Sequence, residues 1–546
     1  MRTQTSGNGA YWVHGYIRLY AEHSLTVVVW VRYRRPVQMR NVRKTRESNR
    51  QAEPSLPDDV QQRAEAVRSL FGASADVVVR TYVAPNAERP VAATFHVDGM
   101  VDADLLARCV TGPLAVAVQA YSGADCGAPF NMPASAFHSP DVRRISNVGE
   151  AAGMAIRGHT IVILEGDSAM LVSNTAAVIG RVIEEPTTES TVRGSKEGFV
   201  ENLRTNTALI RRSIADPRLR VEEMSIGRTA HTRVATLHVD GIVNSMVLTE
   251  VRERLAMIDV DALHESGHLE ELIEDAPYSI FPTMMRTERP DRAAGALLEG
   301  RVVLVVDGTP FVLIVPVTFT MFLTTSEDYF ERFPLGTLAR LLRVVAFALS
   351  MLLPALYVAV TTFHQEALPT PLMLSIAAQR EGIPFPAVFE ALIMELTFEV
   401  VREAGIRLPR LVGPAVSIVG VLVLGDAAIR SGLVSPIMVI VVAGTGVASF
   451  ATPSFSMAIG ARLLRFAFLF LSAALGLYGI AIGVFAFLAH LTAMESFGVP
   501  FMAPLAPVVP SDLKDSVVRA PWWAIRRRPE SVRPVDSRRA RGEERR

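Results

Sequence analysis

The stretch VVAFALSMLLPALYVAVTTF, from Val344 to Phe363, decides the fold class of this 546-residue chain. It holds twenty residues and no formal charge. A second stretch, from Leu411 to Leu491, carries only Asp426, Arg430, Arg462 and Arg465 as charged residues. A helix of about 20 apolar residues spans the hydrocarbon core of a bilayer, and a longer tract holds several spans. We therefore predict an integral membrane protein, because a buried helix in a soluble domain explains one short apolar run but not several long ones.

The apolar tracts divide into about four spans within a transmembrane domain of residues 331–495, and the last three lie near 411–429, 433–452 and 466–490. Four spans leave both chain ends on one side of the membrane. The tail, residues 496–546, is basic, so the positive-inside rule puts it in the cytoplasm, with Trp522 and Trp523 at the membrane interface. A fifth span would instead place this tail outside.

An internal repeat organises the region before the membrane. Thr94-Phe-His-Val-Asp-Gly-Met-Val-Asp102 recurs 142 residues later as Thr236-Leu-His-Val-Asp-Gly-Ile-Val-Asn244. Each copy reads as an apolar strand, a turn, a helical pattern and a second apolar strand. We therefore predict an α/β soluble region of two tandem repeated subdomains, residues 57–192 and 193–330, followed by an all-α polytopic transmembrane domain. The basic segment 1–56 is predicted to be a disordered arm.

The Asp-Gly pairs that end the repeated strands have two interpretations. Gly99 and Gly241 either line a ligand site or supply a positive φ for a tight turn, and the turn is much the commoner role. The chain has no G-x-G-x-x-G or Walker A sequence to favour a phosphate site there.

One motif suggests an enzyme. His264-Glu265-Ser266-Gly267-His268 fits HExxH, in which two histidines bind zinc and the glutamate activates water, and Glu288 is a candidate third ligand. Gly267 weakens the helix that this chemistry needs. The alternative is a polar turn leading into a helix over 269–274, and we favour that interpretation.

A charged segment inside the transmembrane domain, residues 385–405, predicts an amphipathic helix. Glu395, Glu399 and Glu403 recur every four residues, with Glu390 nearby, and the opposite face is apolar. Two interpretations remain open for this acidic stripe. It is a solvated face, or stripes from several subunits line a water-filled path in which carboxylates attract cations.

Long stretches of the chain resemble the A subunit of the GerA family of spore germinant receptors. The similar stretches are EALIMELTFEVVREAGIRLPR (Glu390 to Arg410), GLVSPIMVIVVAGTGVASF (Gly432 to Phe450), LEELIEDAPYSIFPT (Leu269 to Thr283) and LLEGRVVLVVDGTPFVLIVP (Leu297 to Pro316). The resemblance covers about residues 58–530 and places His264 and His268 in a structural turn. The family more often has Gln where this chain has Pro414 and Asp426.

The resemblance implies a multi-pass protein of the spore inner membrane whose N-terminal region is cytoplasmic. It implies a homo-oligomer, such as a pentamer, that assembles with a transporter-like GerB-type subunit and a GerC-type lipoprotein and forms a nutrient-gated cation channel. It implies contact with membrane lipid and no nucleic acid, and we expect no catalytic residue, cofactor or metal. The open alternatives are a SpoVAF-like germination amplifier and an HExxH zinc hydrolase.

Charge and periodicity provide the candidate site residues. The ion-path candidates are Glu390, Glu395, Glu399 and Asp426, and Glu395 and Glu399 are expected to face water. The candidates for an apolar gate are Val416, Val419 and Val423.

Overall fold

The structure is a computed structural model that describes residues 5–6, 10–11, 59–85, 87–121, 130, 132–139, 141–177, 185–186, 188–189, 191–407 and 423–540. The chain divides into two units, Met1–Leu56 and Pro57–Arg546. In the first unit the described residues form one antiparallel pair, β1 (Thr5–Ser6) with β2 (Ala10–Tyr11). The rest of the predicted arm, 1–56, lies outside the described residues.

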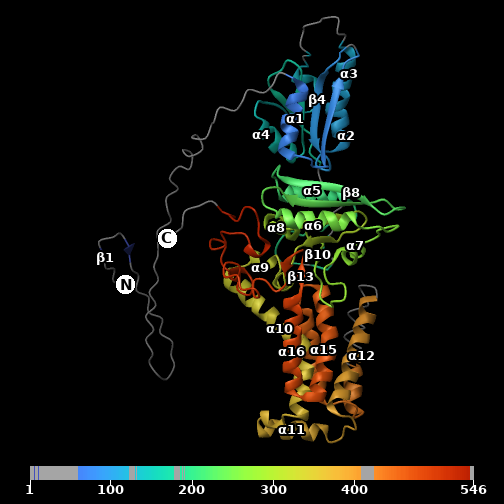
Figure 1. The fold of residues 1–546 in the computed structure, drawn as a ribbon, viewed down its shortest axis with the longest axis vertical. Coiled ribbons are helices and arrows are strands. Elements are labelled where there is room, and N and C mark those ends of the chain that lie inside the picture. Colours follow the sequence, from blue (N-terminus) through green and yellow to red (C-terminus); the bar gives the residue numbers. More distant parts are fainter. Residues whose placement is uncertain are drawn as a thin grey trace. The chain divides into compact units, whose positions relative to one another are not determined.

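The second unit begins with an antiparallel five-stranded sheet in the order β3-β4-β6-β7-β5. Its strands are β3 (Val77–Val83), β4 (Pro90–Val97), β5 (Val142–Ile145), β6 (His159–Leu164) and β7 (Met170–Asn174). Its helices are α1 (Val60–Phe71), α2 (Ala103–Leu106), the π-helical turn η2 (Ala107–Thr111), α3 (Gly112–Ala120) and α4 (Val148–Ile156). Helices α1 and α4 lie on one side of the inner strand β4, and α2 and α3 lie on the other (Figure 1). Coverage of both faces explains why β4 is apolar and buried along almost its whole length.

A second antiparallel five-stranded sheet follows, in the order β8-β9-β11-β12-β10. Its strands are β8 (Leu219–Ile226), β9 (Thr232–Val239), β10 (Met285–Thr287), β11 (Val302–Val306) and β12 (Val312–Val315). Its helices are α5 (Leu203–Ser213), α6 (Ser245–Ala256), α7 (Ser266–Ile273) and α8 (Pro290–Leu298).

The two sheets have the same topology at a constant spacing in the chain. A shift of 142 residues carries the first residues of β3, β4 and β7 onto the first residues of β8, β9 and β12, and α4 onto α8. Gly99 and its counterpart Gly241 have φ values of 78° and 76°, the conformation that the turn interpretation predicts. The repeat found in the sequence is therefore a repeat of the whole fold.

A buried ion pair joins the first copy to the second. Arg211 of α5 donates to both carboxylate oxygens of Asp76, at 2.6 and 2.9 Å, and both side chains are almost completely buried. The Ser74 hydroxyl donates to Asp76 and accepts a hydrogen bond from the backbone N–H of Val221 in β8. The segment before β3 is thus fastened to a helix and a strand of the second copy.

The C-terminal half is helical. Its described helices are α9 (Glu327–Phe330), α10 (Phe333–Thr362), α11 (Thr370–Arg380), α12 (Ala387–Arg407), a helix over 423–430, α14 (Pro436–Phe450), α15 (Phe455–Leu475) and α16 (Leu477–Ala493). Helix α10 packs against α14 and α15, and α12 packs against α10, α14 and α15. Figure 1 shows α10, α12, α15 and α16 as neighbouring helices of one bundle.

The last predicted span, 466–490, is wrong as a single helix. The chain turns at Gly476, which has a φ of 63°, so that α15 and α16 form a hairpin. An added Cβ at Gly479 would lie 2.1 Å from the backbone oxygen of Leu471, and one at Gly483 would lie 2.6 Å from the Phe468 ring. These two glycines, which the sequence marks by GxxxG spacing, allow the two helices to touch.

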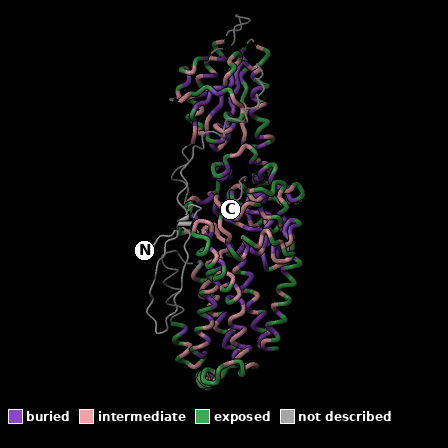
Figure 2. The backbone as a smooth tube through the Cα atoms, turned by 90° about the vertical axis from the view of Figure 1, so that its left-hand side faces the viewer, coloured by how far each residue is buried: buried purple, intermediate pink, exposed green. Residues whose placement is uncertain are grey.

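Large apolar side chains cover the outside of the bundle. More than half of the residue's surface is exposed at Ile440, Val447, Phe450, Phe470, Ile482 and Phe485. Figure 2 shows these helices with exposed residues along their length, whereas much of the core of the sheets is buried. By length and composition, two of the described helices, α10 and α15, suffice to cross a membrane, and α14 and α16 are shorter apolar helices.

The C-terminal tail folds back onto the second copy. The backbone N–H of Val535 donates to the carbonyl of Ile242 at 3.0 Å, and Arg528 donates to the carbonyl of Leu298 at 2.7 Å. Trp522 packs on Tyr329, just before α10. The tail and the second copy therefore lie at the same end of the helix bundle.

Candidate functional site

Helix α12 turns its charged face into the bundle and its apolar face outward. Glu390 and Glu395 are buried, whereas Phe389, Leu396 and Val400 are exposed. A helix on the surface of a soluble protein has the opposite arrangement. The polarity of α12 therefore suits apolar surroundings and polar neighbours.

Glu390 accepts hydrogen bonds from Ser435, the residue that caps the start of α14. Its carboxylate is fully buried and accepts hydrogen bonds from the backbone N–H of Ser435, at 2.6 Å, and from the Ser435 hydroxyl. Ser435 is also the N-cap of α14 and accepts from the N–H of Met438. Arg380 Nε lies 3.7 Å from the other Glu390 oxygen. A carboxylate at this point is favoured by the positive end of the helix dipole.

Glu395 forms the most deeply buried ion pair of the bundle among the described residues. Its Oε2 lies 2.5 Å from Arg465 of α15, and the two side chains are 1% and 2% exposed. Arg465 Nε also donates to the carbonyl of Ser350 in α10, at 2.7 Å, so the pair joins three helices. Glu395 Oε1 and one terminal nitrogen of Arg465 have no hydrogen-bond partner in the described part of the chain. Buried polar atoms of this kind usually bind water, an ion or another polar group.

Glu399 lies where the charged line reaches the edge of the bundle. It contacts Arg402 on the next turn of α12 and lies 3.0 Å from Arg462 of α15, and its side chain is 36% exposed. We call the three glutamates with Arg380, Arg465 and Arg462 the ion-pair seam. It runs from the start of α12 to its middle, and its glutamates change from fully buried at Glu390 to partly exposed at Glu399.

The remaining predicted site residues lie outside the seam. Glu403 and Asp426 are exposed and pair with Arg407 and Arg430 of their own helices. Val423 is exposed at the start of the helix 423–430. The gate candidates Val416 and Val419 lie outside the described residues.

The structure corrects the surroundings expected for Glu395. The sequence analysis has this carboxylate facing water, but here it faces Arg465 inside the bundle. Arg462 and Arg465 are three residues apart on α15 and therefore share one face, which meets the face formed by Glu395 and Glu399. Two arginines in a tract with only four charges were the signal for this pairing, but their partners are about seventy residues away in the chain. A part in an ion path stays a prediction for all these residues.

The HExxH sequence forms a helix cap. Helix α7 begins at Ser266, so His264 lies before the helix and does not share it with His268. The Glu265 carboxylate accepts hydrogen bonds from the Ser266 hydroxyl, the Gly267 N–H and the Thr309 hydroxyl. Partial burial opposes ionisation, but these hydrogen bonds lower the pKa of Glu265. The motif is therefore the polar turn of the alternative interpretation, and its glutamate is engaged as the N-cap.

Comparisons with a family model and with individual proteins point to the same family. Residues 65–531 match the family model of the Bacillus/Clostridium GerA spore germination protein. Spore germination protein KA of Bacillus subtilis (strain 168) is 45% identical over 483 residues, which is 88% of each chain. Spore germination protein B1 of the same organism is 38% identical over 88% of this chain and 99% of its own length.

Among solved structures, the N-terminal domain of the A subunit of the Bacillus megaterium spore germinant receptor GerK3 is similar. It is 30% identical and matches 49% of this chain and 98% of that domain, with a TM-score of 0.35. Because the family model covers most of the chain and several relatives match it over most of their length, this protein belongs to the GerA family of spore germination proteins.

Proposed function

We propose that the chain is the membrane subunit of a spore nutrient germinant receptor and that it oligomerises to form a nutrient-gated cation channel. Membership of the GerA family supports the role in germination. The repeated α/β region would be cytoplasmic and the helices would cross the inner membrane of the spore.

The surface of the bundle supports the membrane placement. Its exposed side chains are largely apolar, and α10 and α15 are long enough to span the hydrocarbon core. The tail contacts the second α/β copy, so the two regions would share one side of the membrane. That arrangement supports an even number of crossings.

The observation that carries the channel proposal is the ion-pair seam inside an apolar-coated bundle. Charged groups at membrane depth are costly and commonly mark ion pathways. In the single chain, arginines neutralise Glu390, Glu395 and Glu399. Opening would separate some of these pairs and leave carboxylates to attract cations, with Asp426 as a further ion-path candidate and Val416, Val419 and Val423 as the apolar gate.

Coupling to the nutrient follows two-state linkage. A transporter-like GerB-type subunit would bind the nutrient, and a GerC-type lipoprotein would complete the assembly. The nutrient shifts the equilibrium only if it binds the open assembly more tightly than the closed one. The repeated cytoplasmic copies would couple neighbouring subunits of a homo-oligomer such as a pentamer.

Cation flux in liposomes tests the proposal. The purified chain is reconstituted alone and with its two partner subunits, and flux of monovalent cations is followed before and after candidate nutrients are added. We expect nutrient-dependent flux with the partners, and a several-fold lower flux for Glu399→Gln. Glu403→Gln is the matched control, because Glu403 lies one turn further on and is exposed. An intact assembly without flux under any nutrient would refute the channel.

A further inference from the structure

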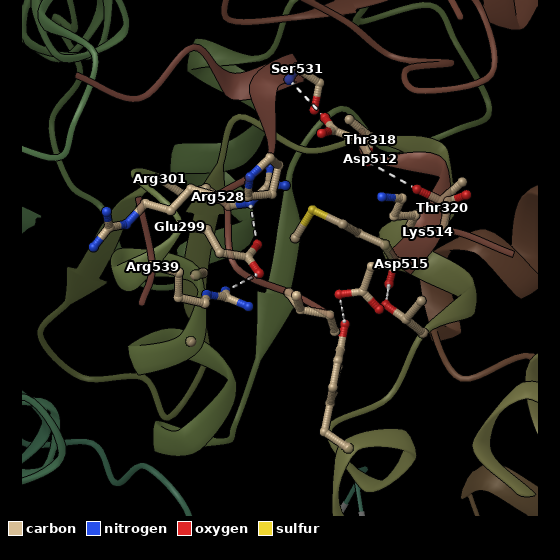
Figure 3. Close-up of a pocket in the computed structure, with 18 of the residues that line it drawn as sticks. Glu299, Arg301, Thr318, Thr320, Asp512, Lys514, Asp515, Arg528, Ser531 and Arg539 are labelled. Atoms are coloured by element: carbon tan, nitrogen blue, oxygen red, sulfur yellow. Dashed lines mark hydrogen bonds and ion pairs between the residues drawn. The ribbon is translucent and has the colours of Figure 1, made fainter. Parts of the chain in front are cut away.

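A large cavity lies where the tail, the segment before α10 and the second α/β copy meet. Its volume is about 780 Å³, and it is lined from all three regions, including Glu299, Tyr329, Lys514 and Arg528. Volumes of roughly 300–1,000 Å³ are usual for small-molecule sites. Figure 3 shows Lys514 on one side of the cavity and Arg301, Arg528 and Arg539 on the other.

The lining carries an excess of positive charge. It contains seven arginines and lysines but four aspartates and glutamates. Most of the cations already have partners: Arg539 pairs with Glu299, Arg528 with Asp536, Arg527 with Glu530 and Arg292 with Glu189.

The acidic residues of the lining already have partners, as Glu299 has in Arg539 and Asp291 has in Arg289. Asp512 accepts the backbone N–H groups of Glu530 and Ser531, at 3.0 and 2.8 Å. Asp515 accepts from the Tyr329 hydroxyl, at 2.8 Å, and pairs with Arg340. Within the described part of the chain this leaves Lys514 and Arg526 without an acidic partner; the Arg526 Nε donates to the carbonyl of Trp523. The cavity is therefore arranged to accept an anion.

The other lining groups suit a phosphate. Hydroxyl groups line the cavity at Thr318, Thr320, Thr325, Ser326, Ser511 and Ser531, and those of Thr325 and Ser511 already donate to Asp328 and Asp512. A phosphate offers several strong acceptor oxygens and pairs well with guanidinium and ammonium groups. We propose that this cavity binds an anionic phosphate group, held by Lys514 and Arg526.

Two sources share that chemistry: the headgroup of an anionic phospholipid and free inorganic phosphate. The lipid source rests on the proposed membrane placement, because the cavity adjoins the start of α10, where Phe333 and Leu335 are exposed, and the exposed Trp522 and Trp523. Tryptophans and basic groups concentrate at the headgroup level of a bilayer. Binding of free phosphate needs no membrane.

Lys514 is next to Asp515, and Asp515 holds Arg340 of α10. A phosphate in the cavity would therefore stabilise the tail in contact with the first helix of the bundle. Occupancy would favour the conformation of α10 in which this contact is made.

The test has two arms on the full chain in detergent. Calorimetric titration with inorganic phosphate measures the free-anion source. Native mass spectrometry after adding phosphatidylglycerol or phosphatidylcholine measures selective retention of the anionic headgroup. Lys514→Ala/Arg526→Ala is compared with Arg538→Ala, which removes an exposed charge from the same tail outside the cavity. Lys514→Glu, at an exposed position, is a second variant that leaves the buried contacts intact.

In one arm, we expect Lys514→Ala/Arg526→Ala to bind its ligand at least about tenfold more weakly, because each of the two substitutions removes a charge-assisted contact to the phosphate group. Binding by Arg538→Ala should be unchanged. Loss in the phosphate arm assigns a free anion, and loss in the phosphatidylglycerol arm assigns a lipid headgroup. Equal binding by Arg538→Ala, the double variant and Lys514→Glu in both arms would overturn the site. Neither arm depends on ion flux. A chain that binds phosphate but never conducts ions would therefore refute the channel and leave the phosphate site intact.

Discussion

Arg465 is the residue on which three helices of the bundle depend, because it contacts Glu395 of α12 and Ser350 of α10 from its place in α15. Removing one member of a buried pair leaves an uncompensated charge, at a cost of about 3–5 kcal/mol. We expect Arg465→Met and Glu395→Met each to lose that stability and the double variant to recover most of it. Denaturant unfolding in detergent measures the three values.

The exposed pair of Arg430 with Asp426 is the matched control, and Arg430→Met is expected to change stability by less than about 1 kcal/mol. A double variant no more stable than the worse single variant would contradict the view that the two charges chiefly compensate each other.

Glu270 of α7 makes stability depend on pH. Burial raises the pKa of its carboxyl from 4.5 to about 7, and the nearby Glu274 and Glu265 add to the rise, although Arg286 opposes it. The folded chain therefore holds this proton more tightly than the unfolded chain. The Glu270 carboxyl makes its full contribution to the free energy of unfolding below about pH 4.5, and this contribution is lost as the pH rises to about 7.

Glu270→Gln removes that ionisation and should stabilise the chain by about 1–3 kcal/mol at pH 8 while changing little at pH 4. The unfolding temperature in detergent, measured from pH 4 to pH 8, provides the comparison. The exposed neighbour Glu271→Gln should give no such pH-dependent difference. A constant difference between Glu270→Gln and the unmodified chain across that range would show that the carboxyl titrates normally.

At the scale of the element, the hairpin of α15 and α16 depends on glycine. A Cβ at position 479 would lie 2.1 Å from the backbone oxygen of Leu471, which cannot move aside as a flexible side chain can. Gly479→Ala should therefore separate the two helices and cost about 1–3 kcal/mol, despite the better helix propensity of alanine. Gly425→Ala is the control, since its new methyl group would meet only a Val439 side-chain carbon at 3.6 Å. Unfolding in detergent should show a loss for the first variant and none for the second.

At the scale of the whole molecule, the buried ion pair of Asp76 with Arg211 links the two α/β copies. Asp76→Ala leaves Arg211 buried without its carboxylate, which should cost about 3–5 kcal/mol and loosen the junction. Hydrogen exchange should rise in the segment before β3 and in α5, while α7 stays protected. Asp259→Ala, which breaks an exposed pair with Arg228, should change neither segment. Unchanged exchange at the junction in Asp76→Ala would mean that other contacts suffice to join the copies.

Properties that depend on near neighbours, or on a pattern repeated along the chain, could be read from the sequence alone. These were the apolar tracts, the 142-residue repeat with its Asp-Gly turns, the acidic stripe of α12 and the resemblance to the family. Each of these features depends on the spacing of residues along the chain, and that spacing indicates helices, strands and turns directly. The sequence did not reveal that the stripe faces inward, because the direction of a helix face depends on what packs against it.

Only the tertiary structure decided which charges meet. Glu395 and Arg465 are 70 residues apart, and Lys514 reaches its cavity because the tail returns to the second α/β copy. The turn at Gly476 likewise depends on distant contacts, since this residue has a φ of 63° and an added Cβ there would lie 2.7 Å from the His364 ring. Contacts between distant segments arise from the packing of the whole chain, and no local period in the sequence specifies them.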